Sequence, residues 1–278
     1  MSVPHTALGS TAPHAPAPSI GDHLRRWRTQ RRMTQLDLAA QANMSTRHLS
    51  CVETGRAQPS RELVLRLAQH LDDPIRERNA WLTAAGFAPM FRNRPLAHED
   101  MAPARRAVEL LLRAHEPFPA LAMDRHWNII ATNRATALVL NGERAPQFLH
   151  GANVIRLCHG PQALASRIAN LAQLRQHQMQ RLQQQIRATA DPALRDLLAE
   201  LQSYPEPEPQ PTSAWVNDST AITAPLQIRT SDGVLTFFTA STVFGSANDI
   251  TLSEMAMELF LPADEFTATA VPLMVGTG

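Results

Sequence analysis

The sequence predicts an α+β protein, in which an all-α bundle of five helices precedes a domain that mixes strands and helices. The bundle is predicted because apolar residues recur at helical spacing over residues 19–85, between clear helix start and stop signals. The mixed domain is predicted because apolar strands flank a turn at residues 124–127 and return, in alternating pattern, over residues 221–261. A chain of 278 residues is long enough for two such cores.

Two short helices joined by a tight turn are the most informative feature of the sequence. Thr34 is placed to cap the first helix, and Asp37, three residues later, completes a capping box. Asn43 follows, and asparagine tolerates the left-handed backbone conformation in which helices often end. Ser45 then caps the second helix, whose apolar residues three apart share one buried face. This spacing predicts a helix-turn-helix.

Three more helices surround this corner in the predicted bundle. Ser19 and Asp22 mark the start of the first, and Ser60 marks the start of the fourth, after a loop that begins at Gly55. A fifth helix is expected over residues 74–85. The plain alternative is a two-helix corner in an ordinary all-α domain, because capping boxes are common.

The outward face of the second short helix is polar. Short polar side chains and one arginine at an exposed helix N-terminus are what a helix needs to read base edges in a DNA major groove. We therefore refer to this helix as the reading helix. Its outward face carries Thr46, Arg47, His48, Ser50 and Cys51.

Residues 21–71 resemble the DNA-binding domain of the xenobiotic-response-element family, whose fold is shared with phage repressors. The resemblance rests on Thr-Gln-x-x-Leu-Ala from Thr34 and on Val-Glu-x-Gly-Arg-x-x-Pro from Val52. It implies a homodimer that binds a palindromic operator in double-stranded DNA, with the two reading helices about 34 Å apart. A buried bidentate pair between Arg28 and Glu53 is implied as well.

Roles for individual side chains follow from the same resemblance. Arg47 is expected to read a base, and Arg56, in the loop after the reading helix, is expected to contact the phosphate backbone. The complete set of predicted DNA-binding residues is Gln35, Ser45, Thr46, Arg47, His48, Ser50 and Arg56.

The distribution of charge agrees with DNA binding at one end of the chain. Residues 1–100 contain 13 Arg and 9 acidic residues, a balance of +4, and residues 101–278 contain 13 Arg and 16 acidic residues, a balance of −3. A basic first part suits contact with phosphates, whereas the mildly acidic remainder does not. The absence of Lys, together with abundant Ala, is typical of a GC-rich bacterial genome.

Nothing in the sequence predicts an enzyme, a membrane protein or a metal centre. It lacks a Gly-rich phosphate loop, a nucleophile elbow and a paired-carboxylate constellation. Its two cysteines form no disulfide or zinc pattern, and no apolar run is long enough to span a membrane. Cys158 and His159 are neighbours, but adjacent side chains rarely point at each other. We therefore expect a cytoplasmic, non-enzymatic protein with no cofactor.

The rest of the chain divides by composition. Residues 1–18, rich in Pro and small residues, predict a disordered tail, and residues 92–102 predict a polar hinge. The second domain is expected over residues 103–266, with a tail over residues 267–278. Its predicted elements are a helix from about Pro103, strands on either side of residues 124–127, helices at 134–140, 161–188 and 192–202, a Pro-rich spacer at 204–211, and strands at 221–229, 234–244 and 250–261.

The order of these elements is that of a PAS-like sensor, with strands first, helices in the middle and a meander last. The domain resembles the MmyB-like ligand-binding domain that accompanies this type of helix-turn-helix in bacterial regulators. This resemblance implies a pocket for a small apolar ligand, with a fatty acid as the implied candidate. It rests on residues 124–128, 133–135, 225–230, 237–245 and 251–254.

Apolar residues of the last strands are the predicted ligand-binding residues. Methionine adapts to flexible chains, although a methionine on a sheet face is more often simple core. Arg156 and Arg229 carry the charge that a ligand carboxylate would need, with ordinary surface pairing as the alternative. The predicted ligand-binding residues are Phe237, Phe244, Met255 and Met257.

The sequence thus favours a sequence-specific DNA-binding transcription regulator whose second domain binds a small apolar ligand and modulates operator binding. Two alternatives stay open. The first is a ligand-independent repressor or antitoxin-type DNA-binding protein, against which the large second domain argues. The second is a redox-responsive regulator that acts through Cys51 on the reading helix.

Overall fold

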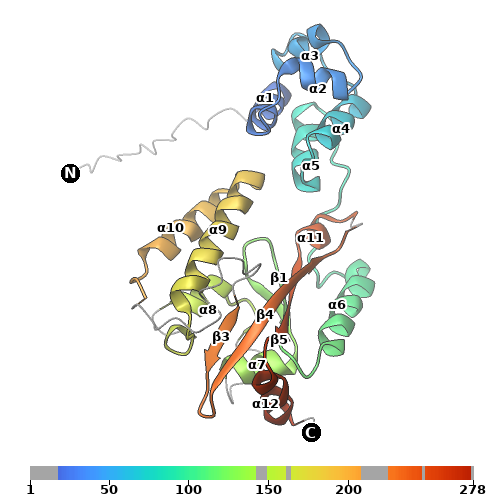
Figure 1. The fold of residues 1–278 in the computed structure, drawn as a ribbon. Helices are drawn as coiled ribbons and strands as arrows, with labels where there is room; N and C mark the ends of the chain where they lie inside the picture. Colours follow the sequence, from blue (N-terminus) through green and yellow to red (C-terminus); the bar gives the residue numbers. More distant parts are fainter. Residues whose placement is uncertain (1–17, 142–148, 161–163, 208–224, 246–247, 277–278) are drawn as a thin grey trace, which may run out of the picture. The chain divides into compact units, whose positions relative to one another are not determined.

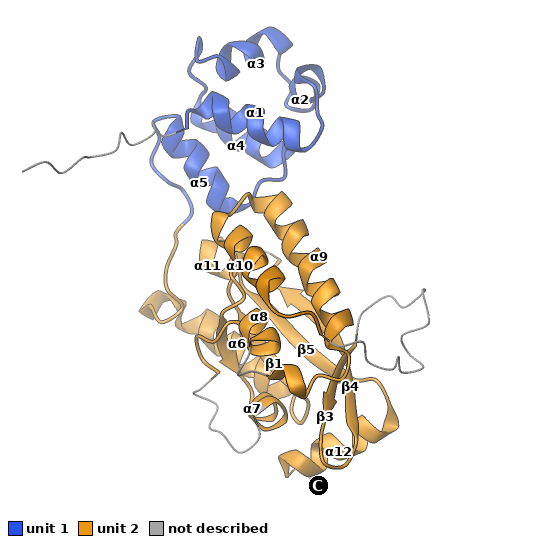
Figure 2. Ribbon diagram, turned by 90° about the vertical axis from the view of Figure 1, so that its left-hand side faces the viewer, with its two compact units in different colours: residues 1–91 blue, residues 92–278 orange. Residues whose placement is uncertain are grey.

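The computed structural model describes residues 18–141, 149–160, 164–207, 225–245 and 248–276. The chain forms two compact units, residues 1–91 and 92–278, which Figure 2 shows in different colours. Residues 1–17 of the predicted tail, and the predicted spacer from residue 208 onward, lie outside the described residues. No helix in the described ranges is long and apolar enough to cross a membrane.

The described part of the first unit, from residue 18 onward, is a bundle of five helices, as predicted. The first four begin at caps that the sequence indicates, because Ser19, Thr34, Ser45 and Ser60 each accept a hydrogen bond from a backbone N–H three residues ahead. The predicted capping box of Thr34 and Asp37 is confirmed, and Ser19 and Asp22, which mark the predicted start of the first helix, form a second one. The helices are α1 (Ile20–Gln30), α2 (Gln35–Gln41), α3 (Thr46–Glu53), α4 (Arg61–His70) and α5 (Ile75–Ala84).

Close packing fixes the position of α3 in this bundle. Asn43, between α2 and α3, has a φ of +50°, which confirms the predicted left-handed turn. Gly21 lets α1 approach α3, because a Cβ atom at this position would overlap the carbonyl oxygen of Glu53. The core includes the fully buried side chains of Leu24, Trp27, Leu38, Leu49 and Trp81.

In the residues that the structure describes, the second unit is built on a five-stranded antiparallel sheet with the strand order β2-β1-β5-β4-β3. The first strand, β1, pairs with the second, β2, on one side and with the last, β5, on the other, so the sheet joins segments that are distant in sequence. The strands are β1 (Ala120–Met123), β2 (Ile129–Thr132), β3 (Leu226–Arg229), β4 (Val234–Val243) and β5 (Ala256–Pro262).

Helices cover both faces of the sheet, as Figure 1 shows. The larger core lies between one face and α8 (Val154–His159), α9 (Leu171–Thr189) and α10 (Pro192–Ser203). A smaller core lies between the other face and α6 (Ala102–Ala114). The remaining helical elements are η1 (Glu99–Met101), α7 (Arg134–Asn141), η3 (Leu164–Ser166), α11 (Ile250–Ser253) and α12 (Glu265–Val275).

Two predicted boundaries in this unit are wrong, because backbone groups are hydrogen-bonded elsewhere. The helix expected from residue 161 begins at Leu171, since Arg167 and Ala169 form backbone hydrogen bonds of 2.7 and 2.8 Å with β3. The strand expected over residues 250–261 begins at Ala256, since Asp249 first caps the short helix α11. Helix α8 has no counterpart among the predicted elements.

The predicted hinge (residues 92–102) and the predicted tail (residues 267–278) also form ordered contacts in their described residues. The segment expected as a tail from residue 267 forms most of α12, whose Val271 and Val275 are buried in the larger core. The segment expected as a hinge is held at its start, because the N–H of Ile250 donates to the carbonyl of Arg92 at 2.8 Å. Arg94 then pairs with the buried carboxylate of Asp249 at 3.0 Å.

Candidate DNA-reading helix and ligand cavity

The side chains predicted to contact DNA lie at the N-terminal end of α3. The hydroxyl of Ser45 accepts the N–H of His48 at 3.2 Å and so fixes the first turn. Arg47 and His48 are exposed, and Thr46 and Ser50 are half-buried. The opposite face of the helix is buried in the bundle, so one face of α3 is available to a partner.

The loop after α3 carries the other predicted arginine. Arg56 is exposed, and its backbone N–H donates to the carbonyl of Cys51 at 2.8 Å, which holds the loop against the end of the helix. Cys51 itself is a half-buried free thiol on α3. The structure therefore keeps Arg56 beside the reading helix but off its surface.

A buried carboxylate, that of Glu53, joins the three helices of this region. Arg28 of α1 donates from Nε to Oε1 at 2.7 Å and from Nη2 to Oε2 at 3.1 Å, which confirms the predicted bidentate pair. Gln35 of α2 donates to Oε2 at 2.6 Å. Because its amide N–H is bound to Glu53, Gln35 orients the reading helix, which is a role that the sequence prediction did not include.

An apolar cavity of about 290 Å³, which we call the α9 cavity, lies between α9 and the sheet of the second unit. Helix α9 contributes Leu174, His177, Gln178 and Arg181, which share one helix face because they are three or four residues apart. Every strand of the sheet contributes at least one side chain, and α8 closes one side. The apolar lining includes Leu121, Ile129, Leu157, Ile168, Ile228 and Phe260.

Polar groups of the cavity gather around one ion pair. Arg181 Nη1 lies 2.6 Å from Oε1 of Glu258 on β5, and its guanidinium stacks on the ring of Trp127, 4.7 Å from the ring centroid. Glu258 is only 5% exposed. Burial, and to a lesser extent Arg181, lower the pKa of His177 below its ordinary value, so this imidazole is neutral at pH 7.

The amide of Gln178 is used within the protein. His159 Nε2 lies 2.6 Å from its Oε1, and its Nε2 donates to Cys158 Sγ at 3.9 Å. Burial raises the pKa of the Cys158 thiol to about 12, so the sulfur faces the cavity as an unreactive thiol. Cys158 and His159 thus both contact Gln178, and they form no thiol–imidazole pair.

None of the four predicted ligand-binding residues lines this cavity. Phe237 is buried in the larger core, in edge-to-face contact with Phe260 at 6.3 Å between ring centroids. Phe244, Met255 and Met257 pack in the smaller core against α6, on the opposite face of the sheet. All four residues therefore lie in the hydrophobic cores, which is the alternative to ligand binding that the sequence left open.

Neither arginine considered as a carboxylate anchor reaches the cavity. Arg156 forms an ion pair with Glu200 at 2.7 Å, and the pair raises the pKa of its guanidinium. Arg229 donates to the backbone carbonyl of Ile168 at 3.2 Å. The cavity arginine is Arg181, which the sequence prediction did not single out, although its spacing from Leu174 along a helix was a readable signal.

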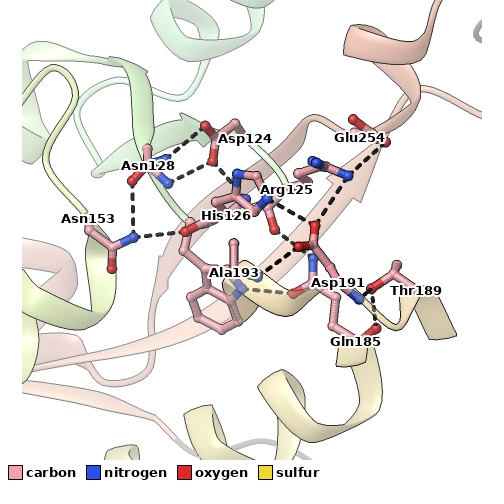
Figure 3. Close-up of polar contacts among 11 residues, drawn as sticks. Asp124, Arg125, His126, Asn128, Asn153, Gln185, Thr189, Asp191, Ala193 and Glu254 are labelled. Atoms are coloured by element: carbon pink, nitrogen blue, oxygen red, sulfur yellow. Dashed lines mark hydrogen bonds and ion pairs between the residues drawn. The ribbon is translucent and has the colours of Figure 1, made fainter. Parts of the chain in front are cut away.

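The turn between β1 and β2 holds the C-terminal end of α9 (Figure 3). Asp191, in the connection between α9 and α10, lies 3.0 Å from His126 Nε2 and 3.2 Å from Arg125 Nη1. The indole N–H of Trp127 donates to Gln185 of α9 at 2.8 Å. These contacts fix the helix that carries Arg181 against the strands that carry the other side of the cavity.

Comparisons with known proteins agree with both parts of this description. Residues 19–81 match the model of a helix-turn-helix domain. A search of curated proteins finds no match. Among solved structures, an RNA-binding light-oxygen-voltage receptor aligns at 13% identity over 93% of this chain and 62% of that chain, with a TM-score of 0.25, which is too low to support an argument. Residues 104–274 match the MmyB-like transcription regulator ligand binding domain, and the chain therefore belongs to this family of helix-turn-helix transcription regulators.

Proposed function

We propose that this protein is a sequence-specific regulator whose affinity for an operator depends on a small apolar molecule bound in the α9 cavity. The observation that carries the proposal is the presence, in one chain, of an exposed polar reading helix and an apolar cavity in a separate unit. A regulator of this kind needs both parts, because one recognises the operator and the other detects the signal.

Two protomers place their α3 helices in successive major grooves of a palindromic operator. Arg47 reads a base edge, because its exposed side chain projects from the reading helix. Arg56 contacts a phosphate, because it projects from the loop that follows. Glu53 and its two partners keep α3 in a single orientation while it does so.

The ligand is a molecule with an apolar chain, the class to which fatty acids belong. The cavity lies near the lower end of the range of volumes typical of small-molecule sites, and most of its lining is aliphatic. Burying an aliphatic chain there is favourable by about 25 cal/mol for each Å² of apolar surface removed from water. Native mass spectrometry of the freshly purified full chain would reveal a co-purifying molecule of this class.

A cavity-filling substitution tests the proposal in the full chain. Thr239 of β4 faces the cavity, so Thr239→Phe should occupy part of it. Thr242→Phe places the same change at an exposed position three residues along the strand, on the other face. Fluorescence anisotropy on an operator selected from random DNA should then measure affinity with and without apolar-chain compounds, beginning with fatty acids and the corresponding alcohols.

We expect an added apolar-chain compound to change the operator affinity of the wild-type chain and of Thr242→Phe, and to leave that of Thr239→Phe little changed. The size of the change is limited by the difference in ligand affinity between the two DNA-binding states, typically about 5–150-fold. Equal responses of the two variants would place the ligand elsewhere. No response in any of the three proteins would favour a ligand-independent repressor.

A further inference from the structure

The polar end of the cavity carries opposite charges that balance. Arg181 supplies the positive charge and Glu258 the negative one, and the two side chains are joined at 2.6 Å. His177 adds no second positive charge, because its imidazole is neutral at pH 7. Among the described residues that line the cavity, no other side chain is charged at that pH.

This balance disfavours an anionic head group. A carboxylate transferred from water into an apolar site needs a positive partner that is not already neutralised. Here it would share Arg181 with Glu258 and lie close to that carboxylate, so two like charges would repel each other at low dielectric. The cavity therefore opposes the charge of a fatty acid while its lining accepts the chain.

Hydrogen-bonding capacity at the same place suits a neutral group. Within the described residues, the carboxylate of Glu258 has one hydrogen-bond partner, Arg181 on Oε1, which leaves Oε2 as an acceptor. Hydroxyl groups of Thr239 and Ser241 lie on the neighbouring strand β4 and line the cavity as well. A ligand that both donates and accepts would satisfy these groups, whereas a carboxylate has no proton to donate.

We propose that the cavity selects an uncharged amphiphile, an apolar chain that ends in a hydroxyl or primary amide, over the carboxylate of the same chain. The hydroxyl or amide donates to Glu258 Oε2 and accepts from Arg181 or a β4 hydroxyl. This inference rests on the proposed function, because it assumes that the ligand chain occupies the α9 cavity. It assigns Glu258 the role of a specificity determinant.

A series with one chain and different head groups tests the inference. Decanoate, 1-decanol, decanamide and methyl decanoate, all below their aggregation concentrations, are titrated into the full chain freed of co-purifying molecules, and calorimetry gives each Kd. We expect 1-decanol and decanamide to bind at least about tenfold more tightly than decanoate. Methyl decanoate, which accepts but cannot donate, should fall between them.

A charge-neutral substitution provides the second arm. Glu258→Gln keeps the shape of the side chain and leaves Arg181 with an unbalanced positive charge, so the order of affinities should invert in favour of decanoate. Glu254→Gln is the matched control, because Glu254 precedes β5 and does not line the α9 cavity. The order of affinities in Glu254→Gln should match that of the wild type.

The possible outcomes separate the two proposals. Decanoate binding as tightly as 1-decanol to the wild type would overturn the head-group inference and leave the proposed function standing. An unchanged order in a folded Glu258→Gln protein would also overturn it. If none of the four compounds binds, both proposals fail. Should Glu258→Gln not fold, as judged by circular dichroism, the wild-type series alone decides the question.

Discussion

Glu53→Gln tests whether the buried carboxylate holds the reading helix in place. The substitution keeps the size of the side chain but removes the charge that Arg28 and Gln35 bind through three hydrogen bonds. Arg28 then remains as a mostly buried cation, with its side chain 16% exposed and no carboxylate partner at this position. Breaking one partner of such a pair costs about 3–5 kcal/mol.

For a unit of this size, that loss should lower the Tm of the first unit by more than about 10 °C. Hydrogen exchange of peptides from α1, α3 and α4, measured against temperature, reports this unit separately from the second. Glu62→Gln is the control, because Glu62 is exposed on α4 and its loss should cost at most about 1 kcal/mol. If the amides of these helices lose their protection from hydrogen exchange at the same temperature in both variants, the role assigned to Glu53 is wrong.

Two further predictions concern the first unit. Arg47→Ala should reduce the free energy of operator binding by about 1–3 kcal/mol and relax the preference at one base pair. Arg56→Ala should instead weaken binding to all DNA and make it less dependent on salt. Equal losses of affinity for operator and random DNA in Arg47→Ala would contradict this assignment. Burial raises the pKa of Asp73 from 3.8 to about 8, so its proton stabilises the folded unit fully below about pH 4, and that stabilisation is lost as the pH rises to 8. The free energy of unfolding of the wild type should therefore fall by a value on the order of 4 kcal/mol between pH 4 and pH 7, and Asp73→Asn should remove this fall. Denaturant unfolding over this pH range measures it, and an equal fall in both proteins would contradict the role given to Asp73.

Much of the first unit could be predicted because its signals are local. A capping box needs only two side chains three residues apart, and the left-handed turn needs only Asn43. The pair between Arg28 and Glu53 was predicted from resemblance to a family, since nothing in the spacing of the two residues indicates it. The participation of Gln35 was missed because the same side chain also suits DNA contact.

The α9 cavity could not be located from the sequence. The alternation of apolar and polar residues shows that a strand has two different faces, but it does not show which helix covers each face. In β5, Met257 faces α6, whereas Glu258 and Phe260 face α9. The sequence prediction chose apolar residues of the last strands, and three of them, Phe244, Met255 and Met257, lie in the smaller core. A charged residue inside an apolar strand was the better signal, because burying Glu258 requires a partner on another element, and that partner is Arg181.

The same strand gives the proposed ligand response a route toward the first unit. Glu258 and Phe260 of β5 line the cavity, and α11 lies immediately before this strand in the chain. The N–H of Ile250 in α11 binds the carbonyl of Arg92, and Asp249 binds the side chain of Arg94, so the segment that follows residue 91 is attached to the element that leads into β5. In the proposed mechanism, a ligand would change operator affinity by favouring one arrangement of this attachment over another. The size of that change would be limited by the difference in ligand affinity between the two arrangements, so we expect substitution of Glu258 to alter both the head-group selectivity and the response.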